Sequence, residues 1–405
     1  MRRQLTNSAE SAPNGKSGLN ALRYIPCALQ GKNGLKALSI KRNTNLIMNQ
    51  DYAHQIQEFS HRIRRASAQQ QAVCIQGGGS KTWYGRTPQG ELLDTRAYAG
   101  IVAYEPTELV ITARCGTSLV EIEAALAQEN QMLAFEPPHF GPHGTVGGMV
   151  AAGLSGPRRA TAGAVRDFVL GAVLMDGRGE VLHFGGQVMK NVAGYDVSRL
   201  LAGSMGCLGL LLEVSLKVLP KPFAETTLAF AMSEADAIRC LNQWGGQSLP
   251  ISASAWHVGR LFLRLSGAQA AVQAAKQKLG GEEMTNAEEI WRSLREQTHD
   301  FFTHDGEHAL WRLSLPSTTP ALCLNGKTLL EWGGAQRWLY SAEPGQKIRA
   351  MVQQAGGHVT QFRGGDQSQE VFTPLSAPLL RIHRQLKDSF DPATIFNPGR
   401  LYSSL

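Results

Sequence analysis

The chain has 405 residues, a length that exceeds one ordinary hydrophobic core and predicts two domains. Its hydrophobic content of 43% is typical of a globular protein, and no run of 18 apolar residues indicates a transmembrane segment. The formal net charge of +7 is carried by residues 1–47, where eight Lys and Arg residues stand against one Glu. The rest of the chain is neutral, so binding to nucleic acid is not indicated.

Residues 1–47 form a basic tail that is rich in Ser, Asn and Lys and lacks sustained hydrophobic periodicity. Two interpretations remain open. The segment has the composition of a transit-type presequence, or it is upstream sequence read before a true start at Met48. The second is favoured because no amphipathic Arg-rich helix emerges. In both cases we expect the tail to be disordered or not part of the mature fold.

Six cysteines are scattered along the chain without a Cys-x-x-Cys pair: Cys27, Cys74, Cys115, Cys207, Cys240 and Cys323. This spacing argues against a zinc site or an iron–sulfur cluster held by this chain, and no metal is expected. Several lie in apolar stretches, so buried free thiols in a reducing compartment are expected.

The first half of the chain alternates helical and extended patterns. The expected elements are a helix over 51–69, a strand over 73–75, a strand over 109–115, a helix from the capping box Ser118–Glu121 to about Asn130, a long loop over 136–166, and strands over 168–175, 180–184 and 212–218. The turn at 176–179 predicts a hairpin between two of these strands.

A double proline, Pro220 and Pro222, stops the last of these strands and is interpreted as a domain boundary. Residues 221–385 alternate further strands and helices, such as a strand over 258–265 and a helix over 267–279, and predict a smaller α/β domain. Residues 386–405 contain Asp391-Pro392 and Asn397-Pro398-Gly399 and are expected to form a tail that returns to another part of the chain.

The first candidate binding site is the run Gly77, Gly78, Gly79, Ser80 and Lys81, directly after a predicted strand. Consecutive glycines let the backbone point several N–H groups into one concavity, which can hold a phosphate or diphosphate. A glycine run alone is more often a plain turn. It also lacks the spacing of a dinucleotide-binding or Walker A motif.

A second candidate is the stretch from His143 to Gly171, which is dense in glycine and small apolar residues. A thirty-residue loop inside a compact domain is functional or disordered, and this composition does not fit disorder. So many small residues indicate that a ligand approaches the backbone closely. A third stretch runs from Lys190 to Asp196 and on to Gly209.

Together these stretches resemble the PCMH-type FAD-binding domain of the vanillyl-alcohol-oxidase family. The motifs that carry the resemblance are Gly-Gly-Gly-Ser at 77–80, Gly-Thr-Val-Gly-Gly at 144–148, Arg-Asp-Phe-Val-Leu-Gly at 166–171, Lys-Asn-Val-Ala-Gly-Tyr-Asp at 190–196, Gly-Ser-x-Gly-x-Leu-Gly at 203–209 and Asn-Pro-Gly-Arg at 397–400. Within that family the pattern is most similar to the FAD-binding E subunits of bacterial glycolate oxidases.

The resemblance implies an α+β fold: a FAD-binding domain of two α/β subdomains over 48–220 and a cap domain over 221–385. It implies that FAD is bound by Gly77, Gly78, Gly79, Ser80, Lys81, Gly144, Thr145, Gly147, Gly148, Ser155, Gly156, Gly163, Leu208, Gly209 and Leu210. Members with covalent flavin carry a histidine in the first glycine loop. This chain has Lys81 and Thr82 there, so noncovalent FAD is expected.

No catalytic base is identified from the sequence. Relatives that act on D-lactate or glycolate carry a cap motif rich in histidine and acids, whereas His358, Arg363 and His383 stand apart here. An isolated histidine is more often structural. The tryptophans of the second domain, Trp256, Trp291, Trp311, Trp332 and Trp338, are expected to fill its core.

The resemblance implies an enzyme, the FAD-binding subunit of a glycolate (2-hydroxy acid) oxidase or dehydrogenase complex. Flavin-mediated oxidation of glycolate to glyoxylate would pass electrons to an iron–sulfur subunit, beside a homologous flavin subunit. Alternatives are a scaffold or relay subunit without its own turnover, favoured because no base is found, or an independent flavin oxidase of another substrate. We expect a cytoplasmic protein, with attachment to the inner membrane through partners as a further option.

Overall fold

The computed structural model describes residues 32–186, 196–303, 308–366 and 370–405, with side chains from Asp51 onward. The chain forms two compact units, Met1–Ala53 and His54–Leu405. A long helix, α1 (Lys32–Gln69), passes from the first unit into the second. It contains the helix expected over 51–69. The boundary expected at residue 47 lies within α1 and stays a prediction.

The second unit begins with a parallel pair of strands, β1 (Val73–Gln76) and β2 (Glu91–Asp94). The C-terminal tail lies beside β1, since the N–H of Val73 donates to Ile395 and the N–H of Asn397 donates to Val73. Helix α11 (Ala377–Phe390) precedes this tail and contains the boundary expected at residue 385.

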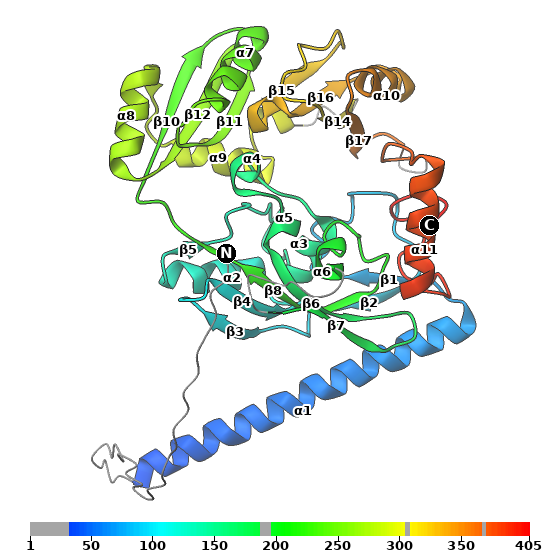
Figure 1. The fold of residues 1–405 in the computed structure, drawn as a ribbon. Coiled ribbons are helices and arrows are strands. Elements are labelled where there is room, and N and C mark those ends of the chain that lie inside the picture. Colours follow the sequence, from blue (N-terminus) through cyan, green and yellow to red (C-terminus); the bar gives the residue numbers. More distant parts are fainter. Residues whose placement is uncertain (1–31, 187–195, 304–307, 367–369) are drawn as a thin grey trace, which may run out of the picture. The chain divides into compact units, whose positions relative to one another are not determined.

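A five-stranded antiparallel sheet follows, with strand order β3-β4-β8-β6-β7 (Figure 1). Its strands are β3 (Ile101–Glu105), β4 (Val110–Arg114), β6 (Val169–Met175), β7 (Val181–Gly185) and β8 (Leu210–Lys217). The four strands expected over 109–115, 168–175, 180–184 and 212–218 are confirmed, and so is the β6–β7 hairpin. The short strands β5 (Gln131–Met132) and β9 (Leu219–Pro220) pair separately.

Helix α2 (Leu119–Gln128) begins as expected, because the Ser118 hydroxyl accepts a hydrogen bond from the N–H of Glu121. The long loop expected over 136–166 is wrong. That stretch contains α3 (Val146–Ala152) and α4 (Arg159–Ala162), and α5 (Val165–Phe168) begins within it. Two glycines weaken α3 as an isolated helix. The Thr145 cap and the burial of Val146, Met149 and Val150 stabilise it in the fold.

After Pro220 the chain enters an eight-stranded sheet in which every pairing is antiparallel. In sheet order the strands are β13 (Glu282–Glu283), β10 (Ala224–Ala231), β12 (Arg260–Gly267), β11 (Ile251–His257), β15 (Lys327–Glu331), β16 (Gln336–Ser341), β14 (Ala309–Ser314) and β17 (His358–Arg363). Its helices are α7 (Glu234–Gly245), α8 (Gln269–Leu279), α9 (Ala287–Glu296) and α10 (Gly345–Gln354). The expected strand at 258–265 and helix at 267–279 are confirmed as β12 and α8.

The two faces of this sheet pack against different partners. One face buries Leu228, Trp256 and Leu263 against α7 and α8, and Trp311 and Leu339 against α10. The opposite face contributes Leu310, Leu329, Trp338 and Phe362 to a core shared with Tyr84, Leu154 and Met205. Four of the five tryptophans expected in this core are buried, and Trp332 is partly exposed. The division into independent domains stays a prediction.

Candidate functional site

An open cavity of about 870 Å³, here called the glycine-loop cavity, lies between four segments of the second unit. Its main walls are the end of β1 with the loop after it (residues 74–82), α3 with its N-cap (145–152), the segment 205–211 before and at the start of β8, and the tail residues Asn397 and Arg400. The volume includes space that is open to solvent.

The backbone N–H groups of residues 77–81 are the main polar feature of this cavity. In the part of the chain that the structure describes, none of them donates a hydrogen bond to another residue. Buried or half-buried backbone donors are nearly always satisfied, so a row of free donors in a concave loop indicates an anionic ligand. The donor set therefore fits the diphosphate expected from the sequence.

Several glycines of the site are required by protein packing as well. A Cβ on Gly78 would lie 1.4 Å from the carbonyl oxygen of His143, and one on Gly77 would lie 2.3 Å from Oγ1 of Thr145. A Cβ on Gly147 would lie 2.7 Å from Cβ of Cys115. The interpretation that only a ligand requires such small residues is therefore wrong for these three positions. At Gly148 only Thr145 Oγ1 would be near, at 3.2 Å.

The start of α3 does not offer free donors to a ligand. The N–H of Val146 donates to Thr117, that of Gly147 to Cys115, and that of Gly148 to the Thr145 hydroxyl oxygen at 3.2 Å. Gly147 and Gly148 can therefore line a ligand, but their N–H groups are already used. The Thr145 hydroxyl keeps its proton available for donation into the cavity.

Lys81 brings a positive charge to the same loop. Its Nζ donates to Ser80 Oγ and to the carbonyl of His139, both at 3.3 Å, and lies 5.3 Å from the ring centre of Phe140. Burial lowers the pKa of Lys81 to about 8, against the opposing attraction of Glu296. An anion in the cavity would favour the charged form of this lysine.

The C-terminal tail holds the glycine loop in place. Asn397 Oδ1 accepts from the N–H of Ile75 at 2.8 Å, and its Nδ2 donates to the carbonyl of Met205 at 2.6 Å. The Arg400 guanidinium donates to the carbonyl of Thr82 at 2.9 Å. Both residues line the cavity but were not among the expected site residues. The Asn-Pro-Gly-Arg motif indicated that the tail matters, but its sequence did not indicate which residues it contacts.

The glycine-loop cavity brings together most of the expected residues: Gly77, Gly78, Gly79, Ser80, Lys81, Thr145, Gly147, Gly148, Gly209 and Leu210 line it. Gly144, Ser155, Gly156, Gly163 and Leu208 do not. Leu208 is buried, and Gly163 has a φ of +107° at the end of α4, a conformation that accounts for a glycine there. The motif segment 190–195 lies outside the described residues. Sequence reasoning missed Cys115, Ala151, Ala152, Met205 and Gly206.

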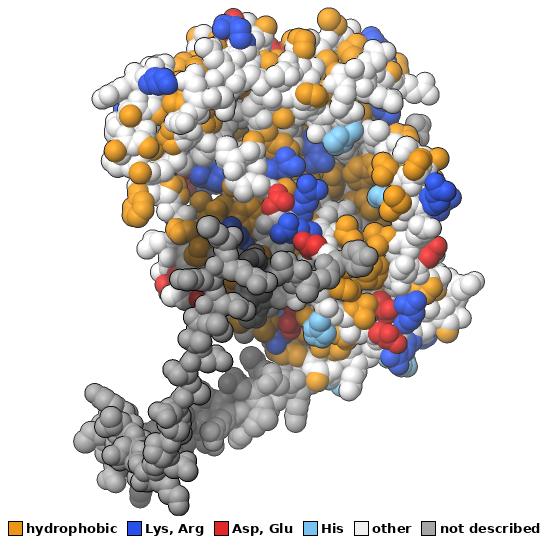
Figure 2. All heavy atoms as spheres, viewed as in Figure 1, with side chains coloured by type: hydrophobic (Ala, Val, Ile, Leu, Met, Phe, Trp, Pro, Cys, Tyr) orange, Lys and Arg blue, Asp and Glu red, His pale blue; other side chains and the backbone are white. Residues whose placement is uncertain are grey.

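A second cavity of about 320 Å³, here called the sheet-face cavity, contains Ser155 and Gly156. It is also lined by Leu154, two positions after Ala152, the last α3 residue of the glycine-loop cavity. Opposite these residues are α9 and the inner face of the eight-stranded sheet, with Arg312, Glu331, Gln336, Trp338 and Phe362. Figure 2 shows Lys and Arg side chains, with a few acids, gathered in the hollow at the middle of this side of the molecule.

Glu331 is the most perturbed acid of this cavity. Its side chain is buried, and Oε2 accepts from Trp338 Nε1 at 2.6 Å and from Gln336 Nε2 at 2.9 Å. Burial raises the pKa of Glu331 to about 7, with a smaller contribution from Glu136, although both hydrogen bonds favour the carboxylate. A carboxyl group that titrates near neutral pH in a cavity is a candidate acid or base.

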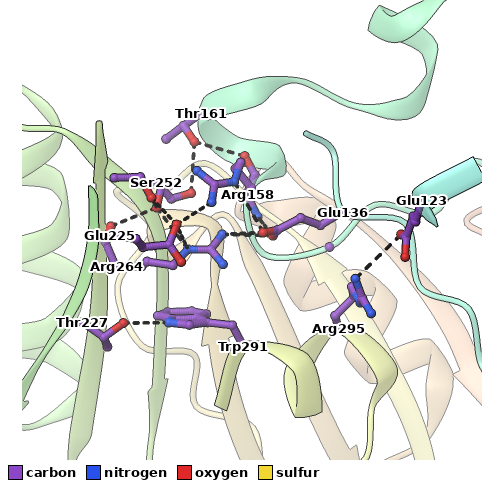
Figure 3. A network of polar contacts seen from close by, with 12 residues as sticks. Glu123, Glu136, Arg158, Thr161, Glu225, Thr227, Ser252, Arg264, Trp291 and Arg295 are labelled. Carbon is purple, nitrogen blue, oxygen red and sulfur yellow. Dashed lines mark hydrogen bonds and ion pairs between the residues drawn. The ribbon is translucent and has the colours of Figure 1, made fainter. Parts of the chain in front are cut away.

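A buried ion-pair network fixes the sheet to the segment before α3 (Figure 3). The Arg264 guanidinium donates to Glu136 at 2.8 Å and 3.0 Å, and Arg158 donates to Glu225 at 2.7 Å. Burial opposes ionisation of Glu136, but Arg264 and Arg158 outweigh it and hold the pKa below its ordinary value. Arg264 also stacks near the ring of Trp291, 5.0 Å from its centre. The network positions the walls of the sheet-face cavity.

The described residues present neither a metal-binding cluster nor a membrane-spanning helix. No group of three or more His, Cys, Asp or Glu side chains there is arranged to hold a metal ion. No helix in the described ranges is long and apolar enough to cross a bilayer. Of the described cysteines, all free, Cys115 and Cys207 are buried as expected, whereas Cys323 is exposed.

Comparison with known proteins identifies relatives of this chain in sequence and in fold. The family described as FAD binding domain (FAD_binding_4) matches residues 51–185. Alkyldihydroxyacetonephosphate synthase has the same fold, with a TM-score of 0.58 over 84% of this chain and 74% of that chain at 14% identity. The expected PCMH-type α+β fold is thereby confirmed.

Two curated relatives define the family more closely. A D-lactate dehydrogenase of Archaeoglobus fulgidus is 30% identical over 202 residues, which cover 48% of this chain and 44% of that protein. The glycolate oxidase subunit GlcE of Escherichia coli (strain K12) is 50% identical over 355 residues, covering 88% of this chain and 99% of that protein. With a glycine-loop cavity suited to a diphosphate and this identity along nearly the whole relative, the chain belongs to the GlcE family of FAD-binding glycolate oxidase subunits.

Proposed function

We propose that this chain is the FAD-binding subunit of a complex that oxidises glycolate, or a closely related 2-hydroxy acid, to the 2-oxo acid. The observation that carries the proposal is the row of free N–H groups at residues 77–81 in an open cavity lined by glycines. The 50% identity to E. coli GlcE, a glycolate oxidase subunit, supports the substrate class. The family match over residues 51–185 supports FAD as the cofactor.

The residues of the glycine-loop cavity have distinct roles in this proposal. The N–H groups of residues 77–81 and the Thr145 hydroxyl bind the diphosphate, and Lys81 adds charge. Gly147, Gly148, Gly209 and Leu210 form the walls, and Gly144, Leu208 and Gly163 act through the backbone that supports them. Ser155 and Gly156 continue the wall toward the ring system. FAD, when bound, supplies the two-electron acceptor.

We propose that the FAD is held noncovalently. The first glycine loop carries Lys81 and Thr82, neither of which provides the histidine that covalent members use. Denaturation in acid should therefore release all flavin into the supernatant. Yellow colour that remains in the protein pellet would contradict noncovalent binding.

We infer that electrons leave through partner chains, an iron–sulfur subunit and a homologous flavin subunit. The E. coli relative is itself named a subunit, and so is the glycolate oxidase subunit GlcD of Bacillus subtilis, which is 29% identical over 183 residues. The described residues offer no cluster of metal ligands that could carry electrons onward. A place in the cytoplasm and attachment to the inner membrane through these partners stay predictions.

The test is the visible absorption spectrum of the purified full chain, with and without co-expressed partners, before and after anaerobic addition of glycolate. We expect a flavin spectrum that bleaches with glycolate. Acetate, which has the carboxylate but no 2-hydroxyl group, is the matched control and should leave the spectrum unchanged. A chain without flavin, or a flavin that glycolate never reduces in either preparation, would contradict the proposed function.

A further inference from the structure

We propose that the sheet-face cavity is the substrate site of this chain, in which Arg312 binds the carboxylate of a small 2-hydroxy acid and Glu331 accepts the proton of its hydroxyl group. This inference rests on the proposed function and deepens it. It assigns direct turnover to this chain, where the sequence favoured a relay role because no base could be identified. The cavity is smaller than the glycine-loop cavity and is lined by both a cation, Arg312, and a carboxyl group, Glu331.

The sheet register places the two charged groups on one face. Glu331 at the end of β15 pairs with Gln336 of β16, and Arg312 of β14 pairs with Trp338 of β16. Gln336 and Trp338 are two positions apart on one strand, so they and their partners point to the same side of the sheet. That side faces Ser155 and Gly156, the residues assigned to the flavin wall. A substrate held there would lie between the sheet and the cofactor.

Arg312 has the properties of a carboxylate anchor. Its Nη2 donates to the hydroxyl of Tyr84 at 3.0 Å, and the guanidinium lies over the rings of Tyr84 and Phe362 at 5.7 Å and 5.3 Å. It forms no ion pair with the rest of the described chain. Arg264, in contrast, is fully engaged with Glu136. A guanidinium that is positioned by aromatic rings but lacks an anion is suited to bind one in bidentate fashion.

Glu331 has one oxygen available for the substrate. Oε2 is held by Trp338 and Gln336, whereas Oε1 accepts no hydrogen bond from the described chain, although the residue is only 4% exposed. Oε1 is not one of the fully buried unpaired atoms of the described chain, so it keeps access to the cavity and can accept a hydrogen bond from a ligand hydroxyl group. The two donors on Oε2 fix the orientation of the carboxylate, so that Oε1 is presented to the cavity.

The reaction balances with these groups. The O–H bond of the substrate breaks and its proton goes to Glu331 Oε1. The C–O single bond becomes a carbonyl as the C2–H bond breaks, and oxidised FAD, when bound, would accept the hydrogen with that electron pair as a hydride. Arg312 keeps the carboxylate fixed and takes no part in bond making. A base with a pKa near 7 is partly ionised at neutral pH and suits this transfer.

The other charged groups around Glu331 belong to several elements. Arg295 on α9 and Arg312 on β14 line the cavity, and Glu136 acts on Glu331 from the segment before α3. Glu136 stays ionised because Arg264 and Arg158 hold its pKa low. Two further groups near these cavities have pKa values shifted from their ordinary range. The pKa of His358 is lowered by burial and by Arg312, and that of Lys81 is about 8.

The experiment measures oxalate binding to the flavin-loaded full chain by isothermal titration calorimetry at pH 6 and pH 8. Oxalate has no C–H bond to oxidise, so binding is observed without turnover. We compare wild type with Arg312→Gln, Glu331→Gln and a matched control, Glu234→Gln. Burial also raises the pKa of Glu234, but this residue is the first of α7 and lies near Arg337, outside the cavity.

Protonated Glu331 can donate to the second carboxylate of oxalate, whereas ionised Glu331 repels it. If only the protonated form binds, a pKa of about 7 makes binding about tenfold weaker at pH 8 than at pH 6. In Glu331→Gln the ratio of the oxalate affinity at pH 6 to that at pH 8 should be about tenfold smaller than in wild type. Any pH dependence that His358 and Lys81 contribute is present in both proteins, so it cancels in this comparison. Arg312→Gln should bind at least tenfold more weakly at both pH values, and Glu234→Gln should bind as wild type does.

A second measurement is the rate of flavin reduction by glycolate in a single turnover. Loss of a general base is worth about 10²–10⁴-fold, so Glu331→Gln should be slower by that factor and lose the rise in rate through pH 7. A Glu331→Gln chain that keeps the wild-type pH dependence, or an Arg312→Gln chain that binds oxalate normally, overturns the assignment. If one of these two results is found while glycolate still bleaches the flavin of the wild-type chain, the proposed function stands and only the assignment of the cavity is wrong.

Discussion

The buried ion pair Lys387–Asp391 allows a direct test of how the C-terminal tail supports the cofactor site. Both side chains are at most 5% exposed, and Lys387 Nζ lies 2.7 Å from Asp391 Oδ2. Nζ also donates to the carbonyls of Cys207 at 2.8 Å and Phe396 at 2.7 Å. One lysine therefore joins α11, the tail and the segment before β8.

The perturbation is Lys387→Met, which keeps the length of the side chain and removes its charge and three hydrogen bonds. The carboxylate of Asp391 retains the N–H groups of Ile395 and Phe396 but loses its counter-ion in a site with no access to water. Removing one partner of a buried pair costs about 3–5 kcal/mol, because the other charge stays buried. We expect the free energy of unfolding to fall by that amount.

The assay is equilibrium unfolding in urea of the full chain, with Arg384→Met on the exposed side of the same helix as the control. The control should change the free energy of unfolding by less than about 0.5 kcal/mol. Because Asn397 and Arg400 follow in the same tail and contact the glycine loop, Lys387→Met should also bind FAD more weakly. A loss below about 1 kcal/mol with normal FAD affinity would refute the view that this pair fixes the tail.

Three further predictions follow from the site and its surroundings. Burial raises the pKa of Glu331 above its unfolded value, to about 7, so its stabilising effect is complete below about pH 4 and is lost as the pH rises through 7. Unfolding curves of Glu331→Gln and wild type should therefore diverge by about 3 kcal/mol in favour of the variant between pH 4 and pH 8, and parallel curves would disprove the shift. Gly78→Ala should lose bound flavin, because its Cβ would lie 1.4 Å from a carbonyl oxygen, whereas Gly148→Ala meets only a hydroxyl oxygen at 3.2 Å and should stay folded. The flavin-to-protein absorbance ratio and circular dichroism distinguish the two, and full flavin occupancy in Gly78→Ala would show that the loop moves without cost. Glu136→Gln removes the main counter-ion of the buried Arg264 and leaves it Glu225 at 3.9 Å, so it should lower the free energy of unfolding by about 3 kcal/mol in a urea titration, and an unchanged value would mean that Glu225 suffices to neutralise the arginine.

Local sequence signals determined much of the secondary structure. The capping box at Ser118, the hairpin turn at 176–179 and the double proline after β8 depend on neighbouring residues only, and each lies where the structure has a helix start, a turn or the end of a sheet. The glycine run at 77–81 also identified the loop with free donors. The wide range of φ that glycine can adopt is a property of the residue itself and does not depend on packing.

Elements that form only because of tertiary packing could not be predicted from local sequence. Helix α3 contains Gly147 and Gly148, so its propensity is low, and it exists because the fold buries Val146, Met149 and Val150. The glycines themselves were interpreted as evidence of a ligand alone. The structure shows that His143 and other parts of neighbouring loops occupy the space that their side chains would need.

The composition of the site was decided by tertiary structure. Asn397 reaches Ile75 across 322 positions of sequence, and Glu331 and Arg312 meet on one sheet face only because β16 lies between their strands. No spacing in the sequence encodes these contacts, since each depends on which strands become neighbours. The sequence by itself determined the loops that can bind a cofactor. Only the fold could bring an unpaired arginine and a buried carboxylate to the same cavity, because burial and the loss of water create their chemistry.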